Sequence, residues 1–239
     1  MADPKLGIVL ACYNEASHLD DSFKRLTDIL SYANFTYEII FVDDKSTDNT
    51  VEIIDRIINT YSNIPFKKIL HSNNTGRGRA VTDGFKASSA EIVGYIDVDL
   101  EIDAVYIYSF LHAILQGYDA AIGERVSRFS LYSVPRFFTG RTYNMLMKMF
   151  INLPLHDTEA GIKFFNRAKL LSILDMIEDP HWFWDTEVCA RMYKLGYKIK
   201  EIPCIYIRNR TKKSTVNVVR DSLYYFKRLV RFRWVYKSL

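Results

Sequence analysis

The 239-residue chain has little cysteine, glycine or proline and no long apolar run. Its three cysteines, Cys12, Cys189 and Cys204, are an odd number in apolar stretches, which excludes a disulfide framework and predicts buried, reduced thiols. With 10 Gly and 6 Pro there is no low-complexity tract or flexible linker. No apolar run approaches the ~18 residues of a membrane span. Residues 1–5 lead straight into a strand, so we expect no secretory signal and a cytoplasmic protein.

Charge is unevenly distributed along the sequence. From Arg208 to the end, ten Lys or Arg residues stand against one acid, a net charge of +9. The rest of the chain has 22 basic and 27 acidic residues, a net charge of −5. A basic tail on a weakly acidic body predicts contact with an anionic surface. We expect that surface to be a membrane, and we expect no nucleic-acid partner.

Strand and helix patterns alternate through the first half of the chain. Apolar runs predict strands over residues 6–12, 37–42, 66–71, 92–96 and 119–122. Amphipathic stretches between them predict helices over residues 16–32, 51–61, 77–88 and 104–116. This repetition predicts an α/β fold with a mostly parallel sheet and helices on both faces.

The pattern loosens beyond Gly123. Residues 124–135 are polar and turn-rich, and strands are expected over residues 161–165 and 198–207. Helices are expected over residues 137–151, 168–177 and 184–195. We assign residues 1–215 to one domain and residues 216–239 to a basic amphipathic C-terminal helix.

Two acidic turns follow predicted strands: Asp43-Asp44 and Asp97-Val98-Asp99. A parallel sheet binds ligands beyond the carboxyl ends of its strands, so both turns should line one crevice. Residues two apart on an extended chain point the same way, which lets Asp97 and Asp99 converge on one cation. Gathered carboxylates are unfavourable unless something positive lies between them. A divalent metal that carries a diphosphate would satisfy this requirement.

Two further turns also stand between a strand and a helix. Tyr13-Asn14-Glu15 suits a flat base and its ribose, although Asn14 as a helix cap is an equal alternative. Asp43 and Asp44 have the alternative of a turn and a cap, and Ser46 or Thr47 can cap the next helix. In residues 74–80, glycines, two arginines and a helix N-terminus suit phosphate. The spacing is neither that of the dinucleotide fingerprint nor that of the Walker loop.

Together these motifs resemble the family 2 glycosyltransferases, and among them the polyprenyl-phosphate sugar synthases of the dolichol-phosphate-mannose-synthase type. The likeness covers roughly residues 6–214 and includes Gly123-Glu124-Arg125 and the stretch from Asp157 to Phe164. It implies the GT-A fold, with a nucleoside-diphosphate sugar as donor and Mg²⁺ or Mn²⁺ as cofactor. The residues implied to bind the donor are Tyr13, Glu15, Asp43, Asp44, Gly76, Arg77 and Asp97. Asp97 and Asp99 would hold the metal, with Glu101 where relatives place a Gln.

The second half should bind the acceptor, a polyprenyl phosphate. The basic residues that the resemblance implies for the lipid phosphate are Arg125, Arg136, Arg141, Arg208, Arg210 and Lys213; for each, a solvated surface charge is the alternative. A sugar hydroxyl acceptor would instead need a general base such as Asp185 or Glu187. A phosphate monoester needs none, because its second pKa of about 6 leaves it largely dianionic. Helix-start charges are the alternative for both acids.

The tail pattern puts five apolar residues on one helical stripe: Val219, Leu223, Phe226, Val230 and Trp234. Basic residues flank this stripe, which suits a helix lying on an anionic leaflet. The alternatives are a helix docked on the body, or a linker to membrane spans. The sequence therefore predicts an inverting, metal-dependent sugar transferase at the cytoplasmic face of a membrane, with Asp99 and Arg125 as catalytic residues. Transfer to a hydroxyl, a binding module without activity and a nucleotidyltransferase are the alternatives.

Overall fold

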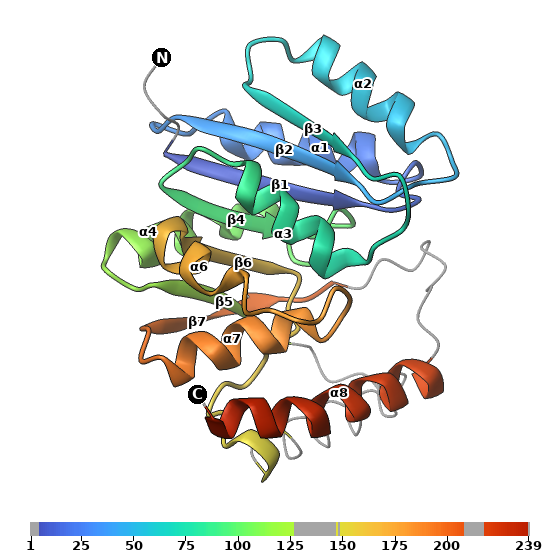
Figure 1. The fold of residues 1–239 in the computed structure, drawn as a ribbon. Coiled ribbons are helices and arrows are strands. Elements are labelled where there is room, and N and C mark those ends of the chain that lie inside the picture. Colours follow the sequence, from blue (N-terminus) through green and yellow to red (C-terminus); the bar gives the residue numbers. More distant parts are fainter. Residues whose placement is uncertain (1–4, 127–146, 148, 208–217, 239) are drawn as a thin grey trace.

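Seven strands form one mixed sheet in the computed structural model, which describes residues 5–126, 147, 149–207 and 218–238 (Figure 1). The strands are β1 (Leu6–Cys12), β2 (Tyr37–Asp43), β3 (Phe66–Leu70), β4 (Ile92–Ile96), β5 (Ala120–Val126), β6 (Ile162–Asn166) and β7 (Ile199–Ile205). Their order is β3-β2-β1-β4-β6-β5-β7. Strand β6 runs antiparallel to β4 and β5, and the other pairs are parallel. The expected α/β fold with a mostly parallel sheet is confirmed.

Helices cover both faces of the sheet, as the strand-helix alternation predicted. They are α1 (Leu19–Leu30), α2 (Thr50–Thr60), α3 (Arg77–Ala87), the 3₁₀ turn η1 (Ala104–Tyr106), α4 (Ile107–Leu115), α6 (Arg167–Leu174), α7 (Trp184–Lys194) and α8 (Val218–Ser238). Helices α1, α2 and α4 bury side chains such as Phe23, Ile54 and Phe110 in one core. Helices α3, α6 and α7 bury Phe85 and Trp184 in a second core. Burial on two faces explains why the central strands are continuously apolar.

Strand β5 is longer than the sequence predicted. It pairs in parallel with β7 along its whole length, from Ala120 opposite Ile199 to Val126 opposite Ile205. Gly123-Glu124-Arg125 therefore lies on a strand, whereas a turn was expected from residue 124. The backbone pairing with β7, which is distant in sequence, overrides the polar local pattern.

Helix α8 docks on the body beside α7 (Figure 1). Its Leu229, Phe232 and Tyr236 are buried with residues such as Phe183 and Cys189 in a third core. The alternative of a docked C-terminal helix is thus confirmed. Among the α8 side chains that the structure describes, Leu223, Phe226 and Trp234 are apolar and exposed, at 57%, 45% and 74%. None of the helices described is long and apolar enough to cross a membrane.

Some sequence predictions fall on residues outside the described ranges. Most of the helix expected over residues 137–151 lies there, and so does the boundary proposed at residue 215. The thiols of Cys12, Cys189 and Cys204 are described and are buried without disulfides, as expected. Burial raises the pKa of the Cys189 thiol to about 12.

Candidate functional site

Three polar turns meet at one edge of the sheet. Strands β2, β1 and β4 are neighbours, they run in the same direction, and each ends at this edge. Tyr13 follows β1, Asp44 follows β2 and Asp97 follows β4. The backbone N–H of Asp44 donates to the carbonyl of Cys12 at 2.9 Å, which fixes two of the turns together.

The turn after β1 is hydrogen-bonded to the loop after β2. Asn14 has a positive φ of 57°, its N–H donates to Ser46 Oγ at 2.9 Å, and its Oδ1 accepts from the N–H of Thr47 at 2.8 Å. The N–H of Glu15 donates to a hydroxyl of the same loop, that of Thr50. Tyr13 is left 43% exposed at the edge.

The capping alternatives for these residues are wrong. Helix α1 begins at Leu19 with His18 at its N-cap position, beyond the reach of Asn14. Helix α2 has Asn49 at its N-cap, so neither Ser46 nor Thr47 caps it. Asn14 instead forms hydrogen bonds with Ser46 and Thr47. These bonds fix the position of the two turns at the edge of the sheet.

Asp43 has one carboxylate oxygen free for a ligand. The side chain is buried, and Oδ2 accepts from the N–H of Ser46 at 3.0 Å. Within the part of the chain that the structure describes, Oδ1 has no hydrogen-bond partner. A buried acceptor without a partner is unfavourable, so this oxygen is suited to a donor that is absent from the structure.

Asp44 holds the glycine-rich loop before α3. Its Oδ1 accepts from the N–H and hydroxyl of Thr75, both at 2.8 Å, and lies 2.8 Å from His71 Nδ1. Its Oδ2 accepts from the N–H of Gly76 at 2.7 Å. These hydrogen bonds lower the pKa of Asp44 although burial opposes them. The Asp44 carboxylate is 4% exposed and engaged by the loop. The substrate contact expected of Asp44 stays a prediction, and its present contacts position the loop.

Gly76 is required by the backbone at the start of α3. Its φ of +101° is one that residues with a side chain rarely adopt. An added Cβ would lie 2.5 Å from the carbonyl oxygen of Pro180, so the loop packs directly on the segment before α7. The first helical residue is Arg77, so the N-terminus of α3 directly follows this loop.

The Arg77 guanidinium joins two acids. Nη2 lies 2.5 Å from Asp97 Oδ1, and Nη1 lies 2.6 Å from Asp185 Oδ2. The aromatic rings of Tyr95 and Trp182 flank it at 4.8 and 5.6 Å. Although burial disfavours its charge, these acids raise the pKa of Arg77 well above its ordinary value. Arg77 was expected to bind phosphate. In this structure its positive charge is paired with the carboxylates of Asp97 and Asp185.

The acidic turn packs against a glycine from a distant segment. The N–H of Asp97 donates to the carbonyl of Gly161 at 2.8 Å, and an added Cβ on Gly161 would lie 2.1 Å from Asp97 Oδ2. Burial and the neighbouring Asp99 raise the pKa of Asp97, against the pull of Arg77. The turn therefore holds more negative charge than one guanidinium neutralises. Its carboxylate oxygens are the ligands that Mg²⁺ and Mn²⁺ prefer, so the donor set fits such an ion.

Glu101 contacts the end of β7. Its carboxylate accepts from the Tyr206 hydroxyl, and its carbonyl accepts from the N–H of Ile207 at 2.8 Å. Among the described residues, Asp97, Asp99 and Glu101 do not bring three ligand atoms within 4.8 Å of one another. The metal role expected of Glu101 stays a prediction, and its present contact is structural.

A different set of possible ligands lies at the ends of β5 and β7. Oxygen or nitrogen atoms of Glu124, His156 and Glu201 all lie within 4.8 Å of one another. The Glu201 carboxylate already accepts from the N–H of His156 at 2.6 Å and lies 2.9 Å from its Nδ1. These contacts account for the cluster as a link between β7 and the segment before β6.

Asp185 lies at the centre of a buried ionic network. Its Oδ1 accepts from Lys163 Nζ at 2.7 Å and from the Tyr95 hydroxyl, and Arg77 binds its other oxygen. Lys163 is fully buried, and Asp185 is 3% exposed. The two cations hold the pKa of Asp185 below its ordinary value despite burial. A low pKa and three partners make this carboxylate a poor general base.

Glu187 is engaged in the same way, far from the acidic turn. Its carboxylate accepts from the N–H groups of Glu178 and Asp179 and from Arg191, whose Nη2 lies 2.7 Å away. The side chain is 2% exposed. The structure therefore supports the alternative offered for this acid, a structural charge in the first turn of α7.

Arg125 forms a two-pronged ion pair at the end of β5. Its Nε and Nη2 donate to the two oxygens of Asp157 at 2.6 and 2.9 Å, and the guanidinium lies 5.9 Å from the Tyr206 ring. Half-buried Glu159 lies in the same region, where burial raises its pKa. The sequence analysis assigned no role to Asp157 or Glu159. Both lie with Gly161 in the motif from Asp157 to Phe164, and that shared motif could have indicated that they belong to the site.

The other expected acceptor residues cannot be placed. Arg136, Arg141, Arg208, Arg210 and Lys213 lie outside the residues that the structure describes. Of the basic acceptor candidates, Arg125 is the one whose surroundings are known.

Comparison with known proteins agrees with this geometry. Residues 7–174 match the family model described as glycosyl transferase family 2. The chain belongs to glycosyl transferase family 2. It is 30% identical to the glycosyltransferase AglD of Haloferax volcanii over 98% of its length and 38% of the relative's. It is 28% identical to a dolichyl-phosphate beta-glucosyltransferase of Saccharomyces cerevisiae over 97% of its length and 75% of the relative's.

A third relative matches over half of the chain. It is a dolichol-phosphate mannosyltransferase of Pyrococcus furiosus, 35% identical over 51% of this chain and 33% of its own. The matches thus cover only 38% and 33% of the length of two of these three relatives.

Solved GT-A glycosyltransferases share the fold. A mannosyltransferase of Pyrobaculum calidifontis in complex with GDP-Man and Mn²⁺ has a TM-score of 0.61 at 19% identity, over 88% of this chain and 59% of that chain. A glucosyl-3-phosphoglycerate synthase of Mycobacterium tuberculosis with Mn²⁺ and UDP has a TM-score of 0.66 at 17% identity, over 97% of this chain and 79% of that chain. The expected GT-A fold is confirmed.

Proposed function

We propose that the chain transfers a sugar, with inversion, from a nucleoside-diphosphate sugar to a polyprenyl phosphate. The observation that carries the donor half of this proposal is the buried Asp43 oxygen without a partner, beside the exposed Tyr13 ring. A base N–H or a ribose hydroxyl would supply the missing donor, and the ring would stack on the base. Glu15 stands in the same turn and is proposed as a further donor contact.

Asp97 and Asp99 would hold Mg²⁺ or Mn²⁺ on the diphosphate, where the ion would neutralise charge on the leaving group. Arg77, from the N-terminus of α3, already supplies a cation to this turn. The glycine loop, which leads into the N-terminus of α3, and the Arg77 guanidinium together suit the diphosphate. Two relatives of known structure were solved with Mn²⁺ and a nucleotide or nucleotide sugar, which supports the same arrangement here.

The acceptor proposal rests on two observations: neither of the two candidate acids is suited to act as a general base, and two relatives are named for a lipid phosphate. The carboxylates of Asp185 and Glu187 are both engaged in buried ion pairs, so neither is suited to activate a hydroxyl. A phosphate acceptor needs no base, and two relatives are named for dolichyl or dolichol phosphate. Arg125 at the end of β5 is the proposed contact for that phosphate.

We further propose that the outward face of α8 rests on the cytoplasmic leaflet of a membrane. Leu223, Phe226 and Trp234 are exposed on it, and Lys227 and Lys237 are exposed on the same helix. Apolar and basic side chains together suit an anionic lipid surface. Docking through Leu229 and Phe232 leaves these residues free for that contact, so the docked helix and the membrane helix are compatible.

Thermal unfolding tests the donor proposal directly. Uridine, guanosine and thymidine diphosphate sugars are screened with and without Mn²⁺, since a ligand that binds the native state raises its apparent stability. We expect one donor to raise the melting temperature only with Mn²⁺, and we expect Asp99→Asn to abolish the shift. A shift without metal dependence, or no shift with any donor, would contradict the proposal.

A further inference from the structure

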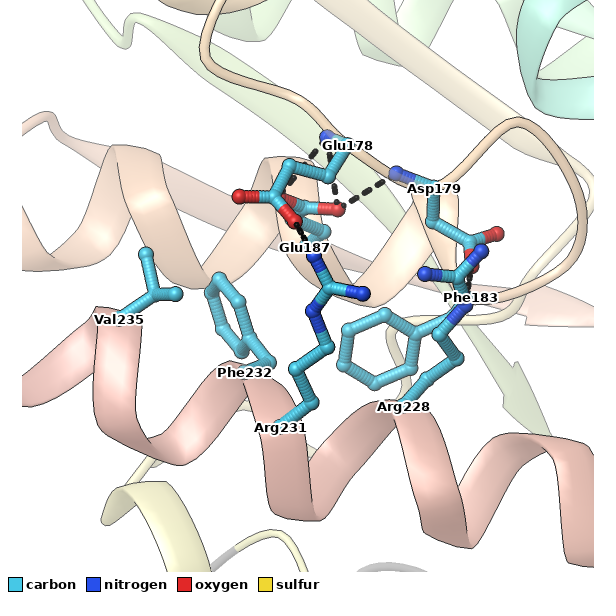
Figure 2. Close-up of a pocket in the computed structure, with 8 residues that line it drawn as sticks. All are labelled: Glu178, Asp179, Phe183, Glu187, Arg228, Arg231, Phe232 and Val235. Carbon is cyan, nitrogen blue, oxygen red and sulfur yellow. Dashed lines mark hydrogen bonds and ion pairs between the residues drawn. The ribbon is translucent and has the colours of Figure 1, made fainter.

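The segment between α6 and α7, residues 178–183, lies between helix α8 and the glycine-rich loop. Figure 2 shows its α8 side, where Glu178 and Asp179 approach Arg231 and Arg228 around a small pocket. Its other side packs on the start of α3. One short segment therefore contacts both the C-terminal helix and the proposed diphosphate loop.

Asp179 receives the contacts from α8. Its Oδ2 accepts from the Tyr224 hydroxyl at 2.6 Å and lies 2.8 Å from Arg228 Nε. The carboxylate is 1% exposed, although Arg228 is 27% exposed. A buried carboxylate is unfavourable without a cation or hydrogen-bond donor beside it, so this ion pair holds residues 178–183 against α8.

Internal hydrogen bonds make the segment rigid. Asp179 Oδ1 accepts from the N–H of His181 at 2.8 Å, which fixes the turn through Pro180. The Glu187 carboxylate accepts the N–H groups of Glu178 and Asp179 at 3.0–3.2 Å. The orientation of the Asp179 side chain therefore determines the position of the backbone of Pro180 and His181.

That backbone sets the position of the glycine loop. The Pro180 carbonyl accepts the N–H of Arg79 at 2.9 Å, in the first turn of α3. An added Cβ on Gly76 would lie 2.1 Å from His181 Nδ1, and one on Gly78 would lie 2.4 Å from Trp184 Cβ. With contacts this close, the loop cannot keep its place if the segment moves.

We infer that Asp179, which is bound by Tyr224 and Arg228 of α8, is a positioning residue for the glycine loop. Through Asp179, the docking of α8 on the body affects how tightly the donor binds. The inference rests on the proposed function, in which this loop receives the donor diphosphate. A preorganised loop binds its ligand more tightly than one that must be ordered on binding. Loosening the Asp179 contacts therefore weakens donor binding and leaves the chemical step intact.

The test compares variants of α8 by calorimetric titration of uridine, guanosine and thymidine diphosphate in the presence of Mn²⁺. For Arg228→Gln, we expect the dissociation constant of whichever diphosphate the wild type binds to rise about five- to tenfold. With a donor sugar in hand, its KM should rise while kcat stays within about twofold. Arg228→Lys, which restores a cation beside Asp179, should recover most of the affinity.

The matched control is Arg231→Gln, one helical turn away. Its ion pair with Glu178 is solvent-exposed at both ends, 70% and 48%, so its loss should leave the dissociation constant unchanged. Tyr224→Phe removes only a hydroxyl and provides the test if Arg228→Gln is unfolded at the assay temperature. Wild-type affinity in both Tyr224→Phe and a folded Arg228→Gln overturns the inference. Failure of the wild-type protein to bind uridine, guanosine or thymidine diphosphate in the same titration overturns the proposed function itself.

Discussion

The edge formed by β1, β2 and β4 and the surface formed by β5, β7 and α8 gather their polar groups in different ways. At the first, each group stands directly after a strand, and parallel neighbours bring the strand ends together. At the second, partners come from distant segments, as when Arg125 meets Asp157 or Tyr225 meets Thr186. Local sequence motifs thus describe the donor edge well, whereas the proposed acceptor surface depends on tertiary packing.

The largest expected effect breaks the donor edge. Asp99→Asn keeps the size of the side chain but removes a charge from the proposed metal site, so we expect transfer to fall at least about 100-fold, or about 2.7 kcal/mol in activation free energy. Initial rates at saturating Mn²⁺ measure it. The control is Asp175→Asn, whose carboxylate is 86% exposed and should not affect the rate. Retention of more than about a tenth of the wild-type rate would contradict the assignment.

The next effect isolates the nucleoside contact. Asp43→Asn keeps an oxygen for the N–H of Ser46 but replaces the partnerless acceptor with a donor. We expect the dissociation constant of the nucleoside diphosphate to rise about tenfold, or 1.4 kcal/mol. Calorimetric titration measures it. Unchanged binding by a folded variant would show that this oxygen does not meet the nucleoside.

A smaller effect separates the two regions. Arg125→Gln should raise KM for the lipid phosphate about fivefold and leave the affinity for the nucleoside diphosphate unchanged, because the ion-pair partner of Arg125 is Asp157 and not a residue of the donor turns. Arg25→Gln is the control, since Arg25 forms a similar two-pronged pair with Asp103 outside the site. Equal effects of Arg125→Gln on donor and lipid would remove the distinction between the two regions.

The smallest effect concerns acid stability. The pKa of Asp44 is lowered in the folded protein, so its stabilising contribution is fully present above the ordinary carboxyl pKa. This contribution is lost as pH falls from the ordinary pKa to the lower pKa of the folded state. Between pH 6 and pH 3, the free energy of unfolding should fall by roughly 1 kcal/mol more in the wild type than in Asp44→Asn. Urea unfolding at each pH measures this difference. Parallel pH curves would show that Asp44 gains nothing from the loop.

The same contrast explains what the sequence could predict. Strand periodicity and the acidic turns located the donor edge, because strand ends and their ligands follow from parallel topology. The sequence did not reveal that Asp44 faces the glycine-rich loop or that Gly161 leaves room for Asp97, since both depend on contacts over 30 or more residues. The sequence predicted the apolar stripe of α8 that includes Leu223, Phe226 and Trp234, and these three residues are exposed. It did not reveal the second apolar face of the helix, on which Leu229 and Phe232 dock on the body.

Transfer to a polyprenyl phosphate is measured most directly by following labelled sugar into a lipid phase. The protein is incubated with Mn²⁺, the donor identified by thermal unfolding, and a polyprenyl phosphate in anionic vesicles. The account predicts labelled polyprenyl phosphate sugar, with release of one nucleoside diphosphate per sugar and no product with Asp99→Asn. Release of pyrophosphate, or label on a hydroxyl acceptor with none on the lipid phosphate, would contradict it.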